Sequence, residues 1–190
     1  MTDLGGAPVV GGTVEVRRLA DDVQIVSGST DEVGRVTLSV PTGGVPVRAY
    51  LHYAKAGFVP ANFFLRSPLA RALSVQLNTG TPEEEAAEAL DLGVVRDPTR
   101  GSYAMQTLDC NGRALGGVAI TFTPATRPYY FDARGYAPDA TATSTEVPYL
   151  QAWNVAPGNL HVAQTYAGTP LASYVVKIFP GEFAFMFGQP

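Results

Sequence analysis

The feature of this sequence that most constrains its fold is a series of short runs in which apolar and polar residues alternate. Residues 12–17 (Gly-Thr-Val-Glu-Val-Arg) and residues 35–40 (Arg-Val-Thr-Leu-Ser-Val) are two such runs, and glycine or proline lies close to each. Alternation at period two places one face of a strand against a core and the other in water. Short strands separated by turns instead of helices favour an antiparallel β-sandwich over a parallel sheet.

The same alternation of apolar and polar residues predicts strands along the rest of the chain. They are expected at residues 23–26, 45–53, 73–77, 102–108, 117–122, 150–155, 160–165, 173–179 and 182–187. Asn111-Gly112 is a strong signal for a tight hairpin turn, because both residues tolerate the left-handed backbone that such turns need. The fold class expected is therefore all-β, made of two antiparallel Greek-key β-sandwich modules.

One short helix is expected between the modules, beginning at Thr81. Thr81 suits an N-cap, Pro82 the first helical position, and Glu84 the reciprocal partner of the cap, while Gly93 suits the stop. The helix carries several carboxylates, which we interpret as a solvated face and not as a metal or partner site. They are Glu83, Glu84, Glu85, Glu88 and Asp91.

The chain is predicted to divide into residues 1–80 (module 1), 81–100 (acidic helix and linker) and 101–190 (module 2). The two halves look like diverged copies of one unit. Residues 10–16 match residues 115–121 in layout, with a Gly-Gly pair before each strand, and residues 38–43 match residues 153–158. Units of fewer than about 100 residues are an ordinary domain size.

These motifs resemble the carboxypeptidase regulatory-like, or transthyretin-like (prealbumin-like), β-sandwich family. The resemblance rests on Gly-Gly-Thr-Val-Glu-Val at 11–16, Thr-Asp-Glu-Val-Gly at 30–34 and Val-Pro-Thr-Gly at 40–43, with similar patterns at 109–118 and 154–158. It covers most of the chain and implies tandem sandwiches of seven or eight strands. The family implies an extracellular, periplasmic or outer-membrane-attached location in bacteria, in a spacer, adhesion or carbohydrate-associated role. Such turn motifs are informative about fold and not about function.

No catalytic, cofactor-binding or metal-binding residue is predicted, and no cofactor. Related intradiol dioxygenases hold iron with two Tyr and two neighbouring His, whereas His52 and His161 lie in different halves. No zinc-peptidase, nucleophile-elbow or phosphate-loop motif occurs. Cys110, the single cysteine, is expected to be a half-buried thiol at a strand end, with a bridge to another chain as the alternative.

Charge and hydropathy exclude other classes of function. The net charge is −4 without a basic patch, which argues against nucleic-acid binding. No stretch has the roughly 20 apolar residues of a membrane span. The first residues lack the basic and apolar regions of a signal peptide, so the chain is expected to be either cytosolic or a mature fragment.

Two segments have the composition of contact surfaces. The aromatic connection 124–139 mixes aromatic, Arg and Asp side chains, which is typical of recognition loops. The candidate binding residues are Tyr129, Tyr130, Arg134, Tyr136 and Trp153. The alternative is that Tyr130 and Phe131 belong to a strand and the remainder is a crossover. The C-terminal aromatic strand, residues 183–187, is expected to be buried in a core or covered by another chain, as an edge-strand contact.

Three functions are therefore weighed, with the partner, protein or glycan, left open. The leading one is a non-catalytic structural or interaction module of a bacterial cell-envelope or secreted protein. The second is a carbohydrate-binding module that uses the aromatic connection and Trp153. The third is a degenerate metalloenzyme of the dioxygenase-like sandwich type.

Overall fold

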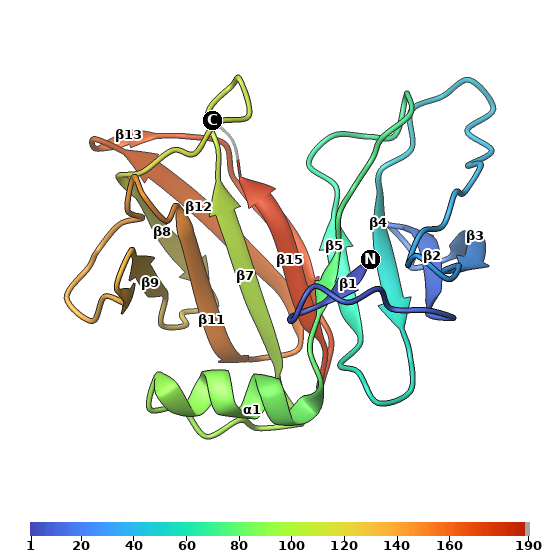
Figure 1. The fold of residues 1–190 in the computed structure, drawn as a ribbon. Helices are drawn as coiled ribbons and strands as arrows, with labels where there is room; N and C mark the ends of the chain where they lie inside the picture. Colours follow the sequence, from blue (N-terminus) through green and yellow to red (C-terminus); the bar gives the residue numbers. More distant parts are fainter. Residues whose placement is uncertain (189–190) are drawn as a thin grey trace. The chain divides into compact units, whose positions relative to one another are not determined.

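The computed structural model describes residues 1–188 and is almost entirely β, with one short helix (Figure 1). This confirms the predicted fold class. The chain divides into two compact units, unit 1 (Met1–Ala87) and unit 2 (Glu88–Pro190). The boundary falls within helix α1 (Pro82–Asp91). The finer division at residues 80 and 101 stays a prediction. No helix among residues 1–188 is long and apolar enough to span a bilayer.

Unit 1 is built on an antiparallel sheet in the order β3-β2-β4-β5. A second pair, β1 and β6, runs parallel. The bounds are β1 (Thr2–Asp3), β2 (Thr13–Arg18), β3 (Gln24–Ser29), β4 (Ala49–Ala54), β5 (Ala61–Phe64) and β6 (Asn78–Thr79). Val9, Val14 and Tyr53 form a buried cluster, against which Val36 and Leu38 pack.

Unit 2 is a sandwich of two sheets. One sheet has the order β10-β9-β11-β7-β15, and the other joins β12 to β8, β13 and β14. The edge-to-face contact of Tyr103 with Phe122, at 5.7 Å between ring centres, links the two sheets. The bounds are β7 (Gly101–Thr107), β8 (Val118–Thr123), β9 (Tyr129–Asp132), β10 (Gly135–Tyr136), β11 (Tyr149–Val155), β12 (Gly158–Tyr166), β13 (Thr169–Pro170), β14 (Tyr174–Ile178) and β15 (Phe183–Gly188).

The two units share a pairing scheme. In unit 1, β4 pairs antiparallel with both β2 and β5, and in unit 2, β12 pairs antiparallel with both β8 and β14. In each unit the first and last strands pair in parallel, β1 with β6 and β7 with β15. The sandwiches are therefore antiparallel except at this closing pair.

Two predicted strands of unit 1 are absent. Residues 35–40 and 73–77 carry the expected alternation but are not strands. Figure 1 draws the segment between β3 and β4 without an arrow until β4 begins. Alternating exposure persists, since Val36 and Leu38 are half-buried while Thr37 and Ser39 are exposed. A strand also needs a hydrogen-bonded neighbour, which the sequence pattern cannot supply.

The helix forms as its caps predict. The Thr81 hydroxyl accepts from the Glu84 N–H at 3.2 Å, and the Glu84 carboxylate accepts from the Thr81 N–H at 2.7 Å. At the other end Gly93 adopts φ +72°, and the Val94 N–H donates to the Ala89 carbonyl at 2.9 Å. Helix α1 is therefore closed by a capping box and a Schellman motif. The predicted solvated face is wrong at Glu85, which is buried.

A buried threonine joins the segment before β2 to the end of β3 in unit 1. The Thr30 hydroxyl donates to the Val9 carbonyl at 2.6 Å and accepts from the Gly12 N–H at 2.9 Å. Its backbone N–H donates to the Gly12 carbonyl at 2.9 Å, and its carbonyl accepts from the Gly11 N–H, also at 2.9 Å. We call this set of four hydrogen bonds the threonine junction.

Unit 2 contains the same junction at Thr143. The Thr143 hydroxyl donates to the Leu115 carbonyl at 3.3 Å and accepts from the Val118 N–H at 3.2 Å. Its backbone N–H donates to the Val118 carbonyl at 2.9 Å, and its carbonyl accepts from the Gly117 N–H at 2.6 Å. Thr30 and Thr143 are each 4% exposed. The spacing of the partners along the chain is the same in both units.

Candidate binding surfaces

The aromatic connection forms the hairpin of β9 and β10. Asp132 pairs with Gly135, and the Asp132 carboxylate accepts from the Arg134 N–H at 2.7 Å, which closes the turn. Tyr129 and Tyr130 pair with Gln151 and Leu150 of β11. The alternative interpretation is confirmed for the strand, since Tyr130 and Phe131 belong to β9, but residues 135–136 pair back onto β9 and are not part of a crossover.

Three of the predicted binding residues are buried. Tyr129, 8% exposed, and Trp153, 4% exposed, belong to a cluster with Ala89 of α1. Tyr130 is 3% exposed, and its hydroxyl accepts from the Ile120 N–H at 2.9 Å. Burial raises the pKa of Tyr130 above its ordinary value. These rings therefore hold unit 2 together, and their faces are not open to a ligand.

The other two predicted residues reach solvent. The Arg134 side chain is 93% exposed and lies 3.7 Å from the Asp132 carboxylate. Tyr136 is half-buried, its ring centre lies 5.6 Å from that of Tyr129, and its hydroxyl accepts from Arg127 at 2.8 Å. Arg134 and Tyr136 line a shallow depression with Asp132 and residues 137–140.

Trp153 is fixed by a polar chain that the sequence did not reveal. Its indole N–H donates to the Gln151 amide oxygen at 3.1 Å, and the Gln151 amide group donates to Glu88 of α1 and to the Tyr149 hydroxyl. Gln151 is only 1% exposed. The amide thus satisfies several buried polar groups at once, and helix α1 is anchored to β11 within unit 2.

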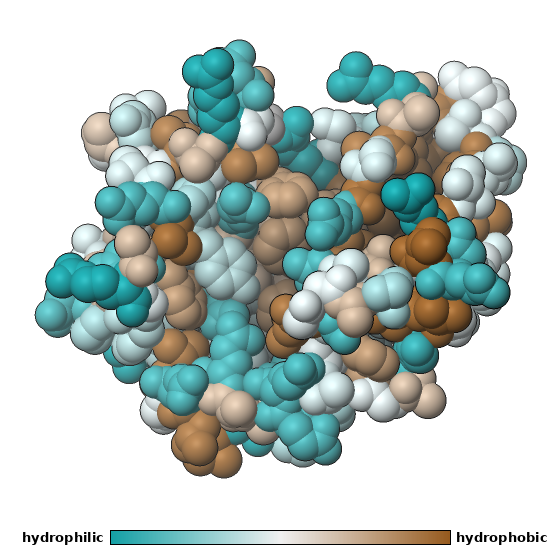
Figure 2. Space-filling model, in the orientation of Figure 1, coloured by the Kyte–Doolittle hydropathy of each residue, from teal (hydrophilic) through white to brown (hydrophobic). Residues whose placement is uncertain are grey.

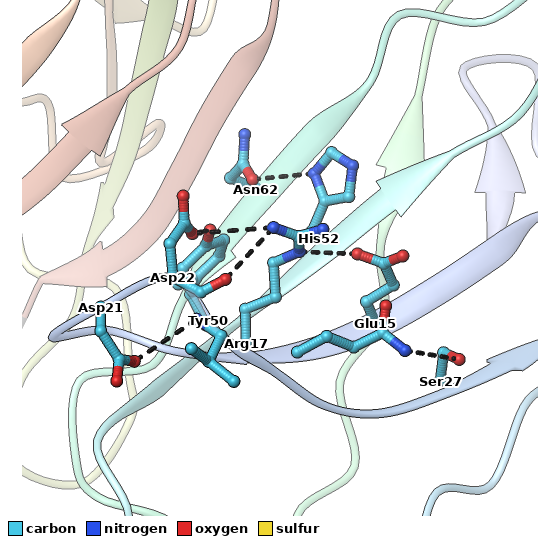
Figure 3. Close-up of polar contacts among 10 residues, drawn as sticks. Glu15, Arg17, Asp21, Asp22, Ser27, Tyr50, His52 and Asn62 are labelled. Atoms are coloured by element: carbon cyan, nitrogen blue, oxygen red, sulfur yellow. Dashed lines mark hydrogen bonds and ion pairs between the residues drawn. The ribbon is translucent and has the colours of Figure 1, made fainter.

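A polar row on the sheet of unit 1 was also missed by sequence reasoning. Ser27, Glu15, His52 and Asn62 lie opposite one another on four consecutive strands (Figure 3). The His52 imidazole Nδ1 lies 3.0 Å from the Asn62 amide oxygen. The alternation of residues 12–17 and 45–53 places Glu15 and His52 on the polar side of their strands. The register between the strands was the information missing from the sequence.

Arg17, two residues after Glu15 on β2, contacts two carboxylates. The Arg17 guanidinium lies 2.6 Å from the Glu15 carboxylate and 3.9 Å from that of Asp22 (Figure 3). The Tyr50 hydroxyl donates to the same Asp22 carboxylate, and Asp22 adopts φ +67°. Non-glycine residues seldom adopt the backbone conformation of Asp22. The contacts that Arg17 and Tyr50 make with its carboxylate therefore help to hold the β2–β3 turn. The charge of Arg17 is neutralised by the two carboxylates.

The histidines and the cysteine lie apart. His52 is on β4 of unit 1, and His161, which is exposed, is on β12 of unit 2. Residues 1–188 contain no group of three or more His, Cys, Asp or Glu side chains arranged to hold a metal ion. The half-buried thiol expected at Cys110 was wrong, because Cys110 is exposed in a turn, and the bridge to another chain stays a prediction.

The Cys110 turn is closed by an aspartate, and its hairpin does not extend further. The Asp109 carboxylate accepts from the Asn111 and Arg113 N–H groups, both at 2.8 Å. These hydrogen bonds are among the causes that lower the pKa of Asp109. Beyond the turn a single bridge, Leu108 with Ala114, forms before the chain passes to the other sheet.

The C-terminal aromatic strand is β15. Ala184 and Met186 are each 2% exposed, whereas Phe183, Phe185 and Phe187 are half-buried. Strand β15 pairs in parallel with β7 along its whole length. The face of β15 that carries Ala184 and Met186 is therefore buried in the core of unit 2. For this face, burial in a core is the alternative that the structure supports.

No protein-family model matches the chain, and no curated protein matches it. Among solved structures, the minor pilin of Streptococcus agalactiae is 12% identical with a TM-score of 0.32, covering 97% of this chain and 84% of that one. The shaft pilin SpaA of Lactobacillus rhamnosus GG is 15% identical with a TM-score of 0.31, covering 98% and 90%. The Bacillus anthracis TIE protein is 11% identical with a TM-score of 0.30, covering 99% and 32%. At these TM-scores the similarities carry no argument about function.

Proposed function

We propose that this chain is a non-catalytic structural and interaction module of a bacterial cell-envelope or secreted protein. In this proposal it consists of two diverged copies of one carboxypeptidase regulatory-like sandwich in tandem. The observation that carries the proposal is the threonine junction, whose four hydrogen bonds recur with the same partners at Thr30 and Thr143.

The use of the polar and aromatic side chains supports a structural role. Arg17 and Glu15 pair within unit 1, while Gln151 and Trp153 are joined within unit 2. Tyr103 is fully buried, and burial raises its pKa well above the ordinary value, so its hydroxyl stays protonated. These five side chains thus serve the scaffold.

The location of the protein in its native bacterium tests this proposal. Intact cells would be treated with a membrane-impermeant amine label and with protease, and the protein followed by antibody. An envelope or secreted module is expected to be labelled or released without cell lysis. Recovery of the whole pool from the cytosolic fraction, unlabelled, would contradict the proposal.

A carbohydrate-binding role is the second candidate, favoured by the depression that Arg134 and Tyr136 line. A glycan array would compare the native chain with the double variant Arg134→Ala, Tyr136→Ala and with Arg113→Ala, an exposed arginine of the Cys110 turn. Binding lost only in the double variant would establish this role. Equal and flat signals from all three proteins would remove it.

A further inference from the structure

The Cys110 turn, residues 109–113, contains the one asparagine of the chain that is followed by glycine. The other asparagines all precede larger residues: Asn62, Asn78, Asn154 and Asn159. An asparagine side chain can close a ring with the main-chain nitrogen of the next residue, and a side chain on that residue hinders the closure. Glycine has no Cβ, so ring closure is least hindered at Asn111-Gly112.

The pair is open to water. Asn111 and Gly112 are both exposed, and a Cβ built on Gly112 would meet no heavy atom within 4 Å beyond the neighbouring residues. In Figure 1 the turn is the yellow-green loop that projects beyond the end of β7, and Figure 2 shows mainly hydrophilic side chains where this loop reaches the surface. Water therefore has free access to the Asn111 side chain.

Hydrogen bonds hold the pair in the closed turn. The Gly112 N–H donates to the Asp109 carbonyl at 3.0 Å, and the Asp109 carboxylate accepts from the Asn111 N–H at 2.8 Å. The Asn111 side-chain amide is also hydrogen-bonded to this carboxylate. The Gly112 nitrogen and the Asn111 side chain must leave these partners before they can react with each other, so the turn slows ring closure without preventing it.

We propose that Asn111 is a site of spontaneous deamidation, which the closed turn restrains. The Gly112 nitrogen forms a bond to the side-chain carbonyl carbon of Asn111, and the bond from that carbon to the amide nitrogen breaks. Ammonia leaves with the proton of the Gly112 N–H, and a cyclic imide remains. Water then adds to one of the two imide carbonyls, and the bond from that carbon to the Gly112 nitrogen breaks as the nitrogen regains a proton. Opening at the side-chain carbon gives aspartate, and opening at the main-chain carbon gives isoaspartate.

Both products act against the closed turn. Aspartate has a carboxylate in place of the amide that is now hydrogen-bonded to Asp109, so attraction is replaced by repulsion between like charges. Isoaspartate adds a CH2 group to the main chain before Gly112. This addition displaces the Arg113 N–H, which now donates to the Asp109 carboxylate at 2.8 Å. Deamidation therefore converts a closed turn of unit 2 into an open one.

Unit 1 contains the same turn without the reactive pair. The Asp31 carboxylate accepts from the Val33 and Arg35 N–H groups, and the Gly34 N–H donates to the Asp31 carbonyl at 2.9 Å. Val33 stands where unit 2 has Asn111, so the turn does not require an amide side chain at this position. Asn111→Val is therefore the matched control, because it removes the reactive amide and retains the turn.

Peptide mass spectrometry of the full chain, incubated at neutral and at mildly alkaline pH, tests the inference. Trypsin releases residues 101–113, which contain Asn111 and no other asparagine, and an unincubated sample sets the background of the digestion. The mass gain that accompanies exchange of NH2 for OH is expected to be faster at Asn111 than at the exposed Asn78 and Asn159. It is expected to accelerate in alkali, which deprotonates the attacking nitrogen, and to yield isoaspartate together with aspartate.

Two variants locate the reaction and its restraint. Asn111→Val is expected to abolish the mass gain in the peptide of residues 101–113. Asp109→Ala removes the carboxylate that holds the turn closed and is expected to speed the reaction about threefold to tenfold, the effect of losing a net hydrogen bond. Trp153 fluorescence verifies that both variants keep unit 2 folded.

Three results would overturn the inference. The first is a mass gain at Asn111 that is no faster than at Asn78 and Asn159. The second is a gain that persists in Asn111→Val, which would place it at Gln106 of the same peptide. The third is an unchanged or lower rate in Asp109→Ala, which would show that the turn does not restrain the reaction. The proposed function is tested by the location of the protein, so either proposal can fail while the other stands.

Discussion

The threonine junctions of unit 1 and unit 2 have the same pattern of hydrogen bonds, although the residues around the two threonines differ. The Thr30 hydroxyl accepts a hydrogen bond from the Gly12 N–H, whereas the Thr143 hydroxyl accepts one from the Val118 N–H. The Thr107 hydroxyl also donates to the Thr143 hydroxyl at 3.2 Å. The comparison teaches that the hydrogen-bonding hydroxyl is the requirement, while neighbouring side chains vary with the space around them.

The largest effect is expected from removing either hydroxyl. Thr30→Val keeps the side-chain shape but leaves the Gly12 N–H and the Val9 carbonyl unsatisfied, so it should lower the free energy of unfolding by about 2–4 kcal/mol. Thr143→Val leaves the Val118 N–H unsatisfied, whereas the Leu115 carbonyl still accepts from the Thr107 hydroxyl, so the expected loss is about 1–3 kcal/mol. Trp153 fluorescence reports unit 2, and amide exchange reports unit 1. The exposed Thr37→Val and Thr141→Val serve as controls, with changes below about 0.5 kcal/mol. Equal losses in variants and controls would break the comparison.

The second prediction concerns the space at Gly12. A Cβ there would lie 2.4 Å from the Tyr53 ring, whereas unit 2 holds Val118 at this place with Gln164 in the position of Tyr53. Gly12→Ala should therefore cost about 1–3 kcal/mol of unit 1 stability through overpacking.

A double variant sharpens this prediction. Gly12→Val with Tyr53→Gln copies the pair of unit 2 and should cost less than the sum of the single changes, as a denaturant double-mutant cycle would measure. If the losses of stability in the two single variants simply added up in the double variant, the Tyr53 ring would not fill the space that the Val118 side chain fills in unit 2.

A smaller effect is expected at the aspartate turns. The Asp31 carboxylate accepts from the Val33 and Arg35 N–H groups as Asp109 does from those of its own turn. Asp31→Ala and Asp109→Ala should each lower the midpoint of thermal unfolding slightly, because two turn N–H groups lose their side-chain acceptor.

Acid unfolding separates the charge of Asp109 from its hydrogen bonds. Its pKa is lowered from 3.8, so its stabilisation is present above that pH and is lost as the pH falls through the lowered value. Asp109→Asn should retain the turn and flatten this part of the acid profile. An unchanged profile would show that the charged form is not favoured by folding.

The smallest effect is expected in alkali. Burial raises the pKa of Tyr53 from 10.0 to about 12, and no partner of its hydroxyl lies among residues 1–188. Its contribution is present below pH 10 and is lost as the pH rises toward 12. Tyr53→Phe should leave neutral stability equal or slightly higher and should lessen the alkaline loss. Lower stability at pH 7 would indicate a partner for the hydroxyl.

The sequence by itself determined the local structure. Alternation placed β2, β7 and β12, and the Thr81, Glu84 and Gly93 signals placed α1 and both of its caps. These features depend on residues close together in the chain, so local propensity and hydrogen bonding are sufficient to form them. The Asp-closed turns are local for the same reason.

Tertiary structure alone decided which strands found neighbours and which aromatic rings stayed open. Residues 35–40 alternate as well as β11 does but are not a strand, because pairing requires a partner distant in sequence. Tyr129 and Trp153 looked like ligand-binding residues, yet packing against Ala89 buried them. The physical reason is that burial and strand pairing are properties of contacts between distant segments, which a local pattern permits but does not supply.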